Sequence, residues 1–234
     1  MKQNIFFDLD RTLWDFETNS ERALKYLFDS TQDKHQLPSF HKFLQIYKEV
    51  NATLWVKYGK KKITKEELRT NRFKTTFFKL GLFNNEISQY FEEEYIRISP
   101  LQTTLFPNTI ETLKMLQNDD YQMHIITNGF KEVQYIKLEN SGLLPFFDKI
   151  ICSEEVGVNK PNIEIFQHAL QLANAKAEKS VMIGDDWEVD VMGAERAGMH
   201  GVHFDAEKKY QRSKVENRIH NLNELPDLLP WLLK

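Results

Sequence analysis

Cysteine is nearly absent from the sequence, since Cys152 is the only one in 234 residues. One thiol cannot form an intrachain disulfide, nor can it build a thiolate cage around a metal ion. Long apolar runs are missing as well: no stretch approaches the ~20 apolar residues of a membrane-spanning helix. The first residues are too short and too charged a stretch for a secretion signal. We therefore expect a soluble protein of the cytoplasm.

An excess of charge of one sign is also missing. The 31 basic and 34 acidic residues leave a formal net charge of -3, so the chain has no bulk attraction for nucleic acid or an anionic membrane. Lysines gather in "KYGKKKITK", residues 57 to 65, where a solvated surface is the simpler interpretation and a funnel for anions is the alternative. We expect neither a nucleic acid polymer nor a membrane as a partner.

Two regions of the chain differ in their hydrophobic pattern. Residues 17 to about 98 carry helical periodicity and few strand signals. In "TKEELRTNRFKTTFFKLGL", Thr64 can cap a helix while Glu67 reaches back to it, and Gly81 stands where that helix would stop. This part of the chain is therefore predicted to be helical throughout.

From residue 105 onward, strands alternate with helices. The apolar stretches "YQMHIITNG", "FDKIICS", "SVMIGD" and "HGVHF" predict strands. We expect a first helix capped by Asn108 and a second, from about residue 131 to 140, that Gly142 terminates. A third helix should have Pro161 in its first turn, and a fourth should close at Gly198. The tail "NELPDLLPWLL" is expected to form a last, irregular helix.

The opening stretch "IFFDLD" is a further predicted strand, although the next one follows about 110 residues later. Strands that alternate with helices predict a parallel sheet joined by right-handed crossovers. The expected fold class is α/β, a Rossmann-like parallel sheet with helices on both faces, plus an inserted all-helical cap domain. We expect residues 1–16 and 99–234 to form the catalytic core and residues 17–98 to form the cap.

Polar residues follow several of the predicted strands, at the edge where an open parallel sheet binds its ligands. Carboxylates buried there without partners would cost several kcal/mol each, so their presence after apolar strands indicates a functional site. The residues expected to meet at this edge are Asp8, Asp10, Thr127, Asn128, Gly129, Lys160, Asp185, Asp186 and Asp190.

This set of side chains favours phosphate chemistry. The acids would repel one another unless a cation shared the site, and oxygen ligands suit Mg²⁺. The Thr127 hydroxyl, the N–H groups near Asn128 and Gly129, and the Lys160 ammonium can then bind the oxygens of a phosphate.

Two aspartates are suited to the chemical steps themselves. Asp8 can attack phosphorus to give an aspartyl-phosphate, a known use of carboxylate nucleophiles. Asp10 can protonate the leaving alkoxide and later deprotonate the attacking water. What remains for the protein is positioning and charge neutralisation, which is most of what phosphoryl transfer demands.

Four stretches resemble the motifs of the haloacid dehalogenase-like (HAD) hydrolase superfamily, in order and at the expected elements. "DLDRT" is similar to the first motif, DxDxT, and "GDDWEVD" is similar to the fourth, GDxxxxD. Thr127 in "IITNG" and Lys160 in "NKP" match the second and third. The resemblance covers residues 5 to about 204, and a helical cap between the first two motifs is an arrangement of that family.

The resemblance implies a role for each matching residue. Asp8 would be the nucleophile and Asp10 the acid and base. The Asp8 carboxylate, the Asp10 backbone carbonyl and Asp185 would be the protein ligands of Mg²⁺, with Asp190 as an outer partner. For Asp186 two interpretations stay open, a place beside the metal and a solvated helix N-cap.

Residues around the motifs carry a finer resemblance and one departure. "FFDLDRTLWDF", "ITNGF" and "SEEVGVNKP" resemble the pyrimidine 5'-nucleotidase (YjjG-like) group, which implies action on uridine and thymidine monophosphates and non-standard pyrimidine nucleotides. Arg11 stands where the superfamily commonly has glycine, so it bears on substrate choice or points to solvent. Trp14, Phe16 and Trp187 are expected to pack in the core or against the flap, and stacking on a nucleobase is the alternative.

We therefore expect a Mg²⁺-dependent phosphomonoesterase that acts on a small phosphorylated metabolite, most simply a pyrimidine nucleoside monophosphate. The alternatives are a phosphoglycolate or sugar-phosphate phosphatase, a phosphosugar mutase and, in a different class, an inactive phosphate-binding protein. A dehalogenase has no need of the second acid, Asp10. A monomer or a weak homo-oligomer is expected.

Overall fold

The computed structural model describes residues 2–35, 37–208 and 217–234. The chain folds as two compact units, one formed by residues 1–16 and 103–234 and the other by Glu17–Gln102. The sequence interpretation returned the chain to the first unit at residue 99, whereas the helical unit extends to Gln102. A short 3₁₀ turn, Ser99–Leu101, accounts for the difference because it continues the last helix of that unit.

The first unit contains a six-stranded sheet in the order β3-β2-β1-β4-β5-β6, in which all the pairs are parallel. The fold class predicted from the sequence is confirmed. A two-residue strand, β6, was not predicted, because so short a segment has no periodicity to read. The strands are β1 (Asn4–Phe7), β2 (Gln122–Thr127), β3 (Lys149–Cys152), β4 (Ser180–Gly184), β5 (His200–Phe204) and β6 (Arg218–Ile219).

Strand β1 lies at the centre of the sheet, and its four residues are buried. Successive side chains point to opposite faces: Ile5 and Phe7 belong to one apolar cluster and Phe6 to another. Because helices cover both faces, the residues of β1 from Ile5 to Phe7 are apolar without alternation.

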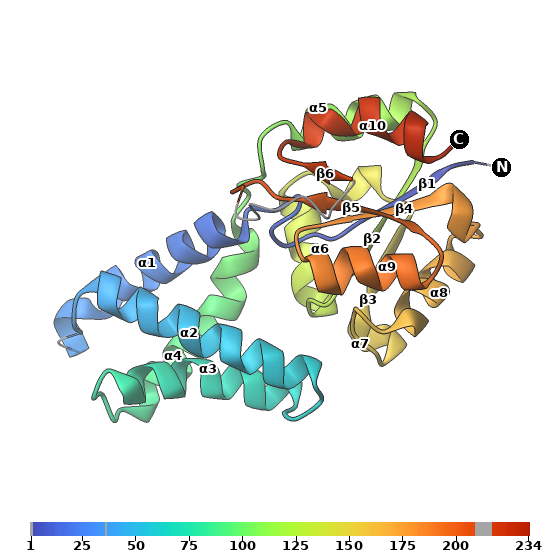
Figure 1. The fold of residues 1–234 in the computed structure, drawn as a ribbon. Coiled ribbons are helices and arrows are strands. Elements are labelled where there is room, and N and C mark those ends of the chain that lie inside the picture. The colour runs from blue at the N-terminus through green and yellow to red at the C-terminus, as the bar shows by residue number, and fades with distance from the viewer. Residues whose placement is uncertain (1, 36, 209–216) are drawn as a thin grey trace. The chain divides into compact units, whose positions relative to one another are not determined.

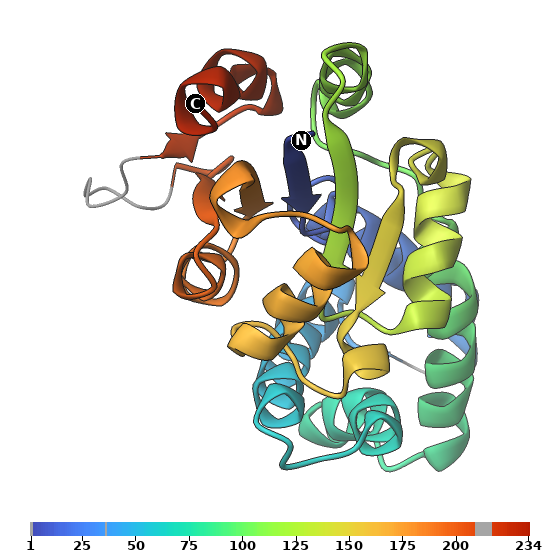
Figure 2. The same cartoon turned by 90° about the vertical axis from the view of Figure 1, so that its right-hand side faces the viewer.

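The helices of this unit form one layer on each face of the sheet. Leucines of α5, α6 and α10 pack in the cluster of Ile5 and Phe7, and apolar residues of α8 and α9 pack in the cluster of Phe6. Figure 1 shows α5 and α10 on one side of the sheet and α8 and α9 on the other, and Figure 2 shows the sheet from a second direction. The helices are α5 (Thr109–Asn118), α6 (Lys131–Asn140), α7 (Ser153–Val156), α8 (Ile163–Leu172), α9 (Met192–Arg196) and α10 (Leu225–Leu232).

Helix α5 begins after Asn108, as predicted, but without the predicted side-chain cap, and the predicted start of α8 is wrong. Asn108 precedes α5 with a left-handed φ of 64° and makes no side-chain cap; instead its amide donates to Asn221 Oδ1 at 2.8 Å. Pro161 lies before α8 and not in its first turn, and Asn162 is the N-cap, with its Oδ1 accepting from Glu164 N at 3.0 Å. The predicted stop after α6 is confirmed, since Gly142 has a φ of 68°.

The second unit consists of α1 (Phe16–His35), α2 (Phe40–Gly59), α3 (Lys65–Lys79) and α4 (Asn85–Ile98). The predicted start of α3 is confirmed: Glu67 N donates to Thr64 Oγ1 at 3.1 Å and Thr64 N donates to Glu67 Oε2 at 2.8 Å. The core is rich in rings, and Phe43 lies 5.5–5.6 Å, centre to centre, from Phe28, Phe77 and Phe91. Helical periodicity in the sequence therefore marks a true core.

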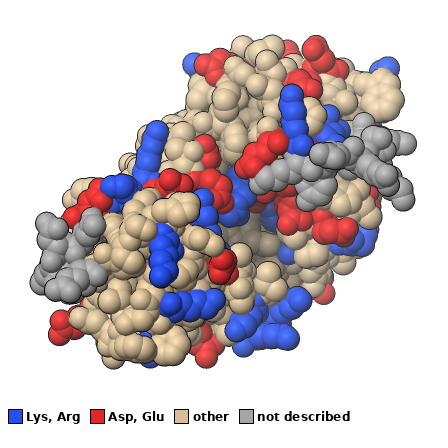
Figure 3. All heavy atoms as spheres, turned by 60° about the vertical axis from the view of Figure 1, so that its left-hand side comes forward, with Lys and Arg blue, Asp and Glu red and all other residues tan. Residues whose placement is uncertain are grey.

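The surface carries both signs of charge. Figure 3 shows Lys and Arg side chains together with Asp and Glu side chains on one face of the molecule. Lys57, Lys60, Lys61 and Lys62 are exposed, which agrees with the solvated interpretation of the lysine-rich stretch. Among the described residues, no helix is long and apolar enough to span a bilayer.

Candidate active site

The candidate site lies at the carboxyl ends of the central strands. Asp8 directly follows β1, and its backbone N–H donates to Ile183 O of β4 at 2.9 Å, which continues the ladder by one residue. Thr127 ends β2, and Asp185 directly follows β4. Carboxylate oxygens of Asp8, Asp185 and Asp190 all lie within 4.8 Å of one another. The strand register thus brings together acids that are far apart in the sequence.

Lys160 lies among these acids. Its Nζ donates to Asp8 Oδ1 at 2.6 Å and to Ile126 O at 2.8 Å, and it lies 2.7 Å from Asp190 Oδ1. The side chain is 2% exposed. Burial alone would lower the pKa of Lys160, but the carboxylates of Asp190 and Asp8 outweigh it and raise that pKa above its usual value. Lys160 is therefore a permanent ammonium at this site.

Asn128 positions the loop that carries Lys160. Its Nδ2 donates to Lys160 O at 3.1 Å, and its Oδ1 accepts from Lys160 N at 2.8 Å. The amide of Asn128 is thus occupied with the backbone across 32 residues of sequence. The backbone N–H of Gly129 donates to Thr127 Oγ1 at 3.0 Å. The phosphate-binding roles of Asn128 and Gly129 stay predictions.

The acids at this edge carry an excess of negative charge. Burial, reinforced by Asp190 and Asp10, raises the pKa of Asp8 to about 7, although Lys160 opposes the shift. Burial, together with Asp8 and Asp190, raises the pKa of Asp185 to about 8. When all three carboxyls are ionised they face one ammonium, which leaves two negative charges without a partner. Oxygen ligands with that charge fit a divalent cation such as Mg²⁺.

Asp190 and Asp186 have different surroundings. Asp190 is buried, with Oδ1 beside Lys160 and Oδ2 accepting from Asp186 N at 3.2 Å. Gly184 leaves room for it, because a Cβ there would come 2.2 Å from Asp190 Oδ2. Asp186 is exposed, and its Oδ1 accepts from the N–H groups of Glu188 and Val189, each at 3.0 Å. Of the two interpretations left open for Asp186, the structure shows the N-cap, at the start of a π-helical turn, Trp187–Val191.

Asp10 is held by two side chains that the sequence interpretation missed. Its Oδ1 accepts from Lys137 Nζ at 2.5 Å, and its Oδ2 accepts from Gln134 Nε2 at 3.0 Å. Gln134 Nε2 also donates to Thr127 Oγ1 at 2.7 Å. The missed signal is a pair of polar residues three apart on α6, on the face that also buries Leu138.

Aromatic residues near the first motif lie in or beside the core. Trp14 is fully buried, and Lys137 Nζ lies 4.2 Å from the centre of its ring. This agrees with core packing as the interpretation of Trp14. Arg11 is exposed and has a left-handed φ of 69°, and its guanidinium lies 4.3 Å from the centre of the Phe16 ring.

His203 and Trp187 lie beside the fourth motif. The Nε2 of His203 lies 3.0 Å from Asp185 O, and the His203 ring is 6.0 Å from that of Trp187. Burial lowers the pKa of His203. A neutral imidazole with its hydrogen on Nε2 can donate a hydrogen bond to that carbonyl, so His203 supports the backbone of Asp185.

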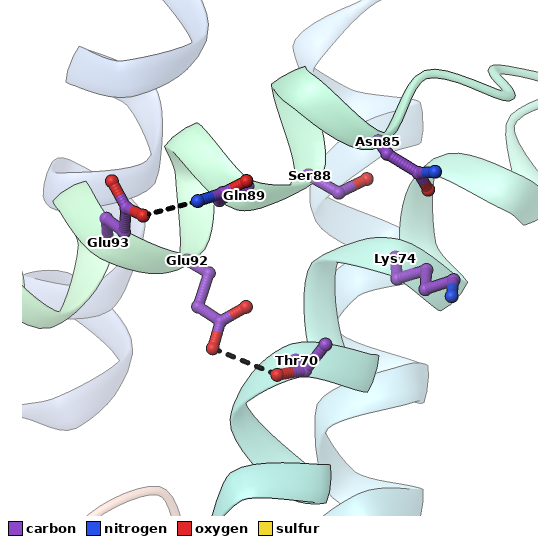
Figure 4. A pocket seen from close by; sticks show the side chains of 7 residues that line it. All are labelled: Thr70, Lys74, Asn85, Ser88, Gln89, Glu92 and Glu93. Atoms are coloured by element: carbon purple, nitrogen blue, oxygen red, sulfur yellow. Dashed lines mark hydrogen bonds between the residues drawn. The ribbon is translucent and has the colours of Figure 1, made fainter.

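A separate hollow lies between α3 and α4 in the helical unit, with a volume of about 400 Å³. Two of its polar contacts are internal: Thr70 Oγ1 donates to Glu92 at 3.2 Å, and Gln89 donates to Glu93 at 2.8 Å (Figure 4). It contains none of the predicted site residues. The lining residues are Thr70, Lys74, Asn85, Ser88, Gln89, Glu92 and Glu93.

Comparisons with known proteins find similarity to hydrolases of one family. The sequence model of the haloacid dehalogenase-like hydrolases matches residues 2–198. Pyrimidine 5'-nucleotidase YjjG of Escherichia coli is 32% identical over 228 residues, which cover 96% of each chain. A glyceraldehyde 3-phosphate phosphatase of Methanothermobacter thermautotrophicus is 28% identical, over 98% of this chain and all of its own.

A solved structure agrees with these sequences. The HAD-hydrolase YfnB of Bacillus subtilis, described as bound to magnesium, has a TM-score of 0.86 and 27% identity. The match covers 98% of this chain and 100% of that one.

Proposed function

The chain belongs to the haloacid dehalogenase-like hydrolase family, and on that basis we propose that it is a Mg²⁺-dependent phosphomonoesterase with Asp8 as its nucleophile. One observation carries the proposal. Asp8 is buried against a permanent ammonium and lies beside two further carboxylates at the ligand-binding edge of the sheet. The ammonium orients the Asp8 carboxylate and compensates its charge. A residue that only ends a strand needs neither.

Asp8 and Asp185 have the carboxylate oxygens to hold Mg²⁺, whereas both oxygens of Asp190 already have partners. When bound, the ion neutralises charge on the phosphoryl group. Lys160 favours the ionised form of Asp8 by lying within hydrogen-bond distance, and Asp190 orients Lys160. The Thr127 hydroxyl is proposed to bind a phosphate oxygen.

The reaction then has two displacements. An Asp8 oxygen forms a bond to phosphorus, the ester P–O bond breaks, and its electron pair stays on the leaving oxygen, which takes a proton from Asp10. In the second step, water attacks phosphorus while Asp10 takes the water's proton. The bond between Asp8 and phosphorus breaks, which releases inorganic phosphate and restores the carboxylate.

A pyrimidine nucleoside monophosphate is the proposed substrate. The support is the identity of 32% to a pyrimidine 5'-nucleotidase over nearly the whole chain and the resemblance of the residues that flank the motifs. A sugar phosphate is the second candidate, because a relative of 28% identity over the same length is a glyceraldehyde 3-phosphate phosphatase.

A phosphate-release screen with Mg²⁺ tests the proposal. The substrates are uridine, thymidine and purine monophosphates, phosphoglycolate and glyceraldehyde 3-phosphate, with the Asp8→Asn variant as the blank. We expect Mg²⁺-dependent release, fastest from the pyrimidine nucleotides, and none from the variant. No release from any ester, or equal release by the variant, contradicts the mechanism. Preference for another ester contradicts only the choice of substrate, and a mutase would convert a sugar phosphate without net release.

A further inference from the structure

We propose that Lys137 and Gln134 are positioning residues that fix the Asp10 carboxylate for proton transfer, and that Trp14 holds Lys137 in place. Helix α6 supplies the first two residues, and the loop after β1 supplies Asp10 and Trp14. The inference rests on the proposed function, because it concerns the residue assigned to move protons in that reaction. Neither the resemblance nor the comparisons assign a role to these three residues.

Lys137 is buried, and its ammonium pairs with Asp10. Its side chain is 5% exposed, and an ammonium buried to that extent requires a charge partner. Among the described residues, Asp10 is the one carboxylate within ion-pair distance, at 2.5 Å. The face of the Trp14 ring lies 4.2 Å from the same nitrogen, which provides a second favourable interaction for the cation. Lys137 is thus confined between a ring and a carboxylate.

Gln134 connects Asp10 to the second motif. Its single Nε2 donates to Asp10 Oδ2 and to Thr127 Oγ1, at 3.0 and 2.7 Å. Gly129 leaves space for this amide, because a Cβ there would come 2.2 Å from the same nitrogen. Any larger residue at 129 would displace Gln134, so the glycine of "TNG" has a steric role.

Together the two side chains bind both oxygens of Asp10. A rotation of the carboxylate would break both hydrogen bonds at once, so its plane is held in one orientation. Proton transfer requires donor and acceptor within hydrogen-bond distance in a suitable geometry, and small displacements are costly in rate. Loss of this support should therefore slow the steps in which Asp10 moves a proton and spare substrate binding.

The choice of leaving group separates these steps. A nucleoside is a poor leaving group and needs a proton from Asp10, whereas nitrophenolate leaves without one. With p-nitrophenyl phosphate, only the hydrolysis of the aspartyl-phosphate depends on Asp10. A misplaced Asp10 therefore gives a burst of about one nitrophenolate per enzyme, followed by slow turnover.

The test uses the full chain with saturating Mg²⁺ and compares Lys137→Met, Lys137→Arg and Gln134→Met with the wild type. For Lys137→Met we expect kcat on uridine monophosphate to fall about 100-fold, with KM changed less than about threefold. The same variant should show the nitrophenolate burst. Lys137→Arg should restore part of kcat, because it keeps the cation, and Gln134→Met should show the same pattern as Lys137→Met to a smaller extent.

Lys131→Met is the matched control, since Lys131 lies on the same helix but is exposed and pairs with Glu155 on the surface. It should behave as the wild type. Lys137→Met and Gln134→Met that also match the wild type overturn the inference. The inference is also overturned if the variants lose the nitrophenolate burst and the steady-state rates with both substrates to the same extent. If the Lys137→Met protein does not fold, the kinetics of Gln134→Met test the inference, because this variant keeps the buried ion pair of Lys137 with Asp10. A wild type that hydrolyses no ester contradicts the proposed function instead.

Discussion

The two units of this chain bury different kinds of side chain. The edge of the sheet buries ionised groups in pairs, such as Lys160 with Asp8 and Lys137 with Asp10. The helical unit buries rings, and its Arg72 lies over ring faces, 5.0 Å from the centre of Tyr95. Buried charge is expensive unless it is paired, and the chain concentrates it at the edge where we propose that a cation and a phosphate bind. The core of the helical unit is built mainly from packed apolar side chains.

The largest expected effect is on activity at the charged edge. Asp8→Asn should lower phosphate release by more than about 1,000-fold, because the amide is not a nucleophile. The matched change in the helical unit is Asp29→Asn, which removes an exposed ion pair with Lys25. It should leave the rate unchanged. Steady-state kinetics of both variants measure the difference, and comparable rates in the two would contradict the role of Asp8.

A stability experiment tests the aromatic core of the helical unit. Phe43→Ala removes a fully buried ring and should lower the free energy of unfolding by about 3–5 kcal/mol. Phe83→Ala is the control, since Phe83 is 80% exposed and should change that energy little. Urea denaturation, followed by circular dichroism, measures both. Equal losses in the two variants would show that burial does not set the contribution of these rings.

A buried histidine gives the sheet a dependence on pH. His124 lies against the Phe6 ring at 4.8 Å, and burial lowers its pKa to about 4. Since the folded state binds the proton less readily than the unfolded chain, stability is complete above about pH 6.5 and is lost as the pH falls toward 4. The loss from this group is at most about 3 kcal/mol.

His124→Gln should remove that part of the acid sensitivity, which urea titrations at pH 7 and pH 4.5 would measure. His41→Gln, at an exposed position of the helical unit, is the control and should keep the wild-type profile. A His124→Gln profile that parallels the wild type would exclude His124 as the source.

Magnesium should stabilise the acidic edge. At a free concentration about a hundred times Kd, the ion should add about 2–3 kcal/mol to the free energy of unfolding. Asp185→Asn should remove most of this gain because it deletes a ligand oxygen. Thermal unfolding with and without Mg²⁺ measures the effect. An equal shift in the wild type and in Asp185→Asn would place the ion elsewhere.

The smallest expected effect concerns backbone strain at Arg11. Arg11→Gly should raise stability by about 0.5–1 kcal/mol, because glycine adopts the left-handed φ of 69° without steric cost. Arg11→Ala separates the effect of backbone strain on stability from the effect of the side chain. It removes the guanidinium but keeps a Cβ, and hence the strain. Differential scanning calorimetry ranks the three proteins, and an alanine variant as stable as the glycine variant would exclude strain as the cause.

Much of the fold was predictable because its signals are local. The strands in "IFFDLD" and "SVMIGD" and the capping box of Thr64 depend on neighbouring residues, and the structure has them. The prediction failed only for the side-chain cap of Asn108 and for the position of Pro161 relative to α8. Both residues have strong local preferences, but Asn108 is drawn to Asn221, 113 residues away.

The site divides in the same way. Sequence alone determined which acids stand at strand ends, and hence Asp8, Asp10 and Asp185 as candidates, because a carboxylate after an apolar strand is visible in the order of residues. Only the tertiary structure decided that Lys137 and Gln134 bind both carboxylate oxygens of Asp10. The physical reason is distance along the chain: Lys137 and Asp10 are 127 residues apart, and a polar residue on a helix shows no partner until the sheet brings one beside it.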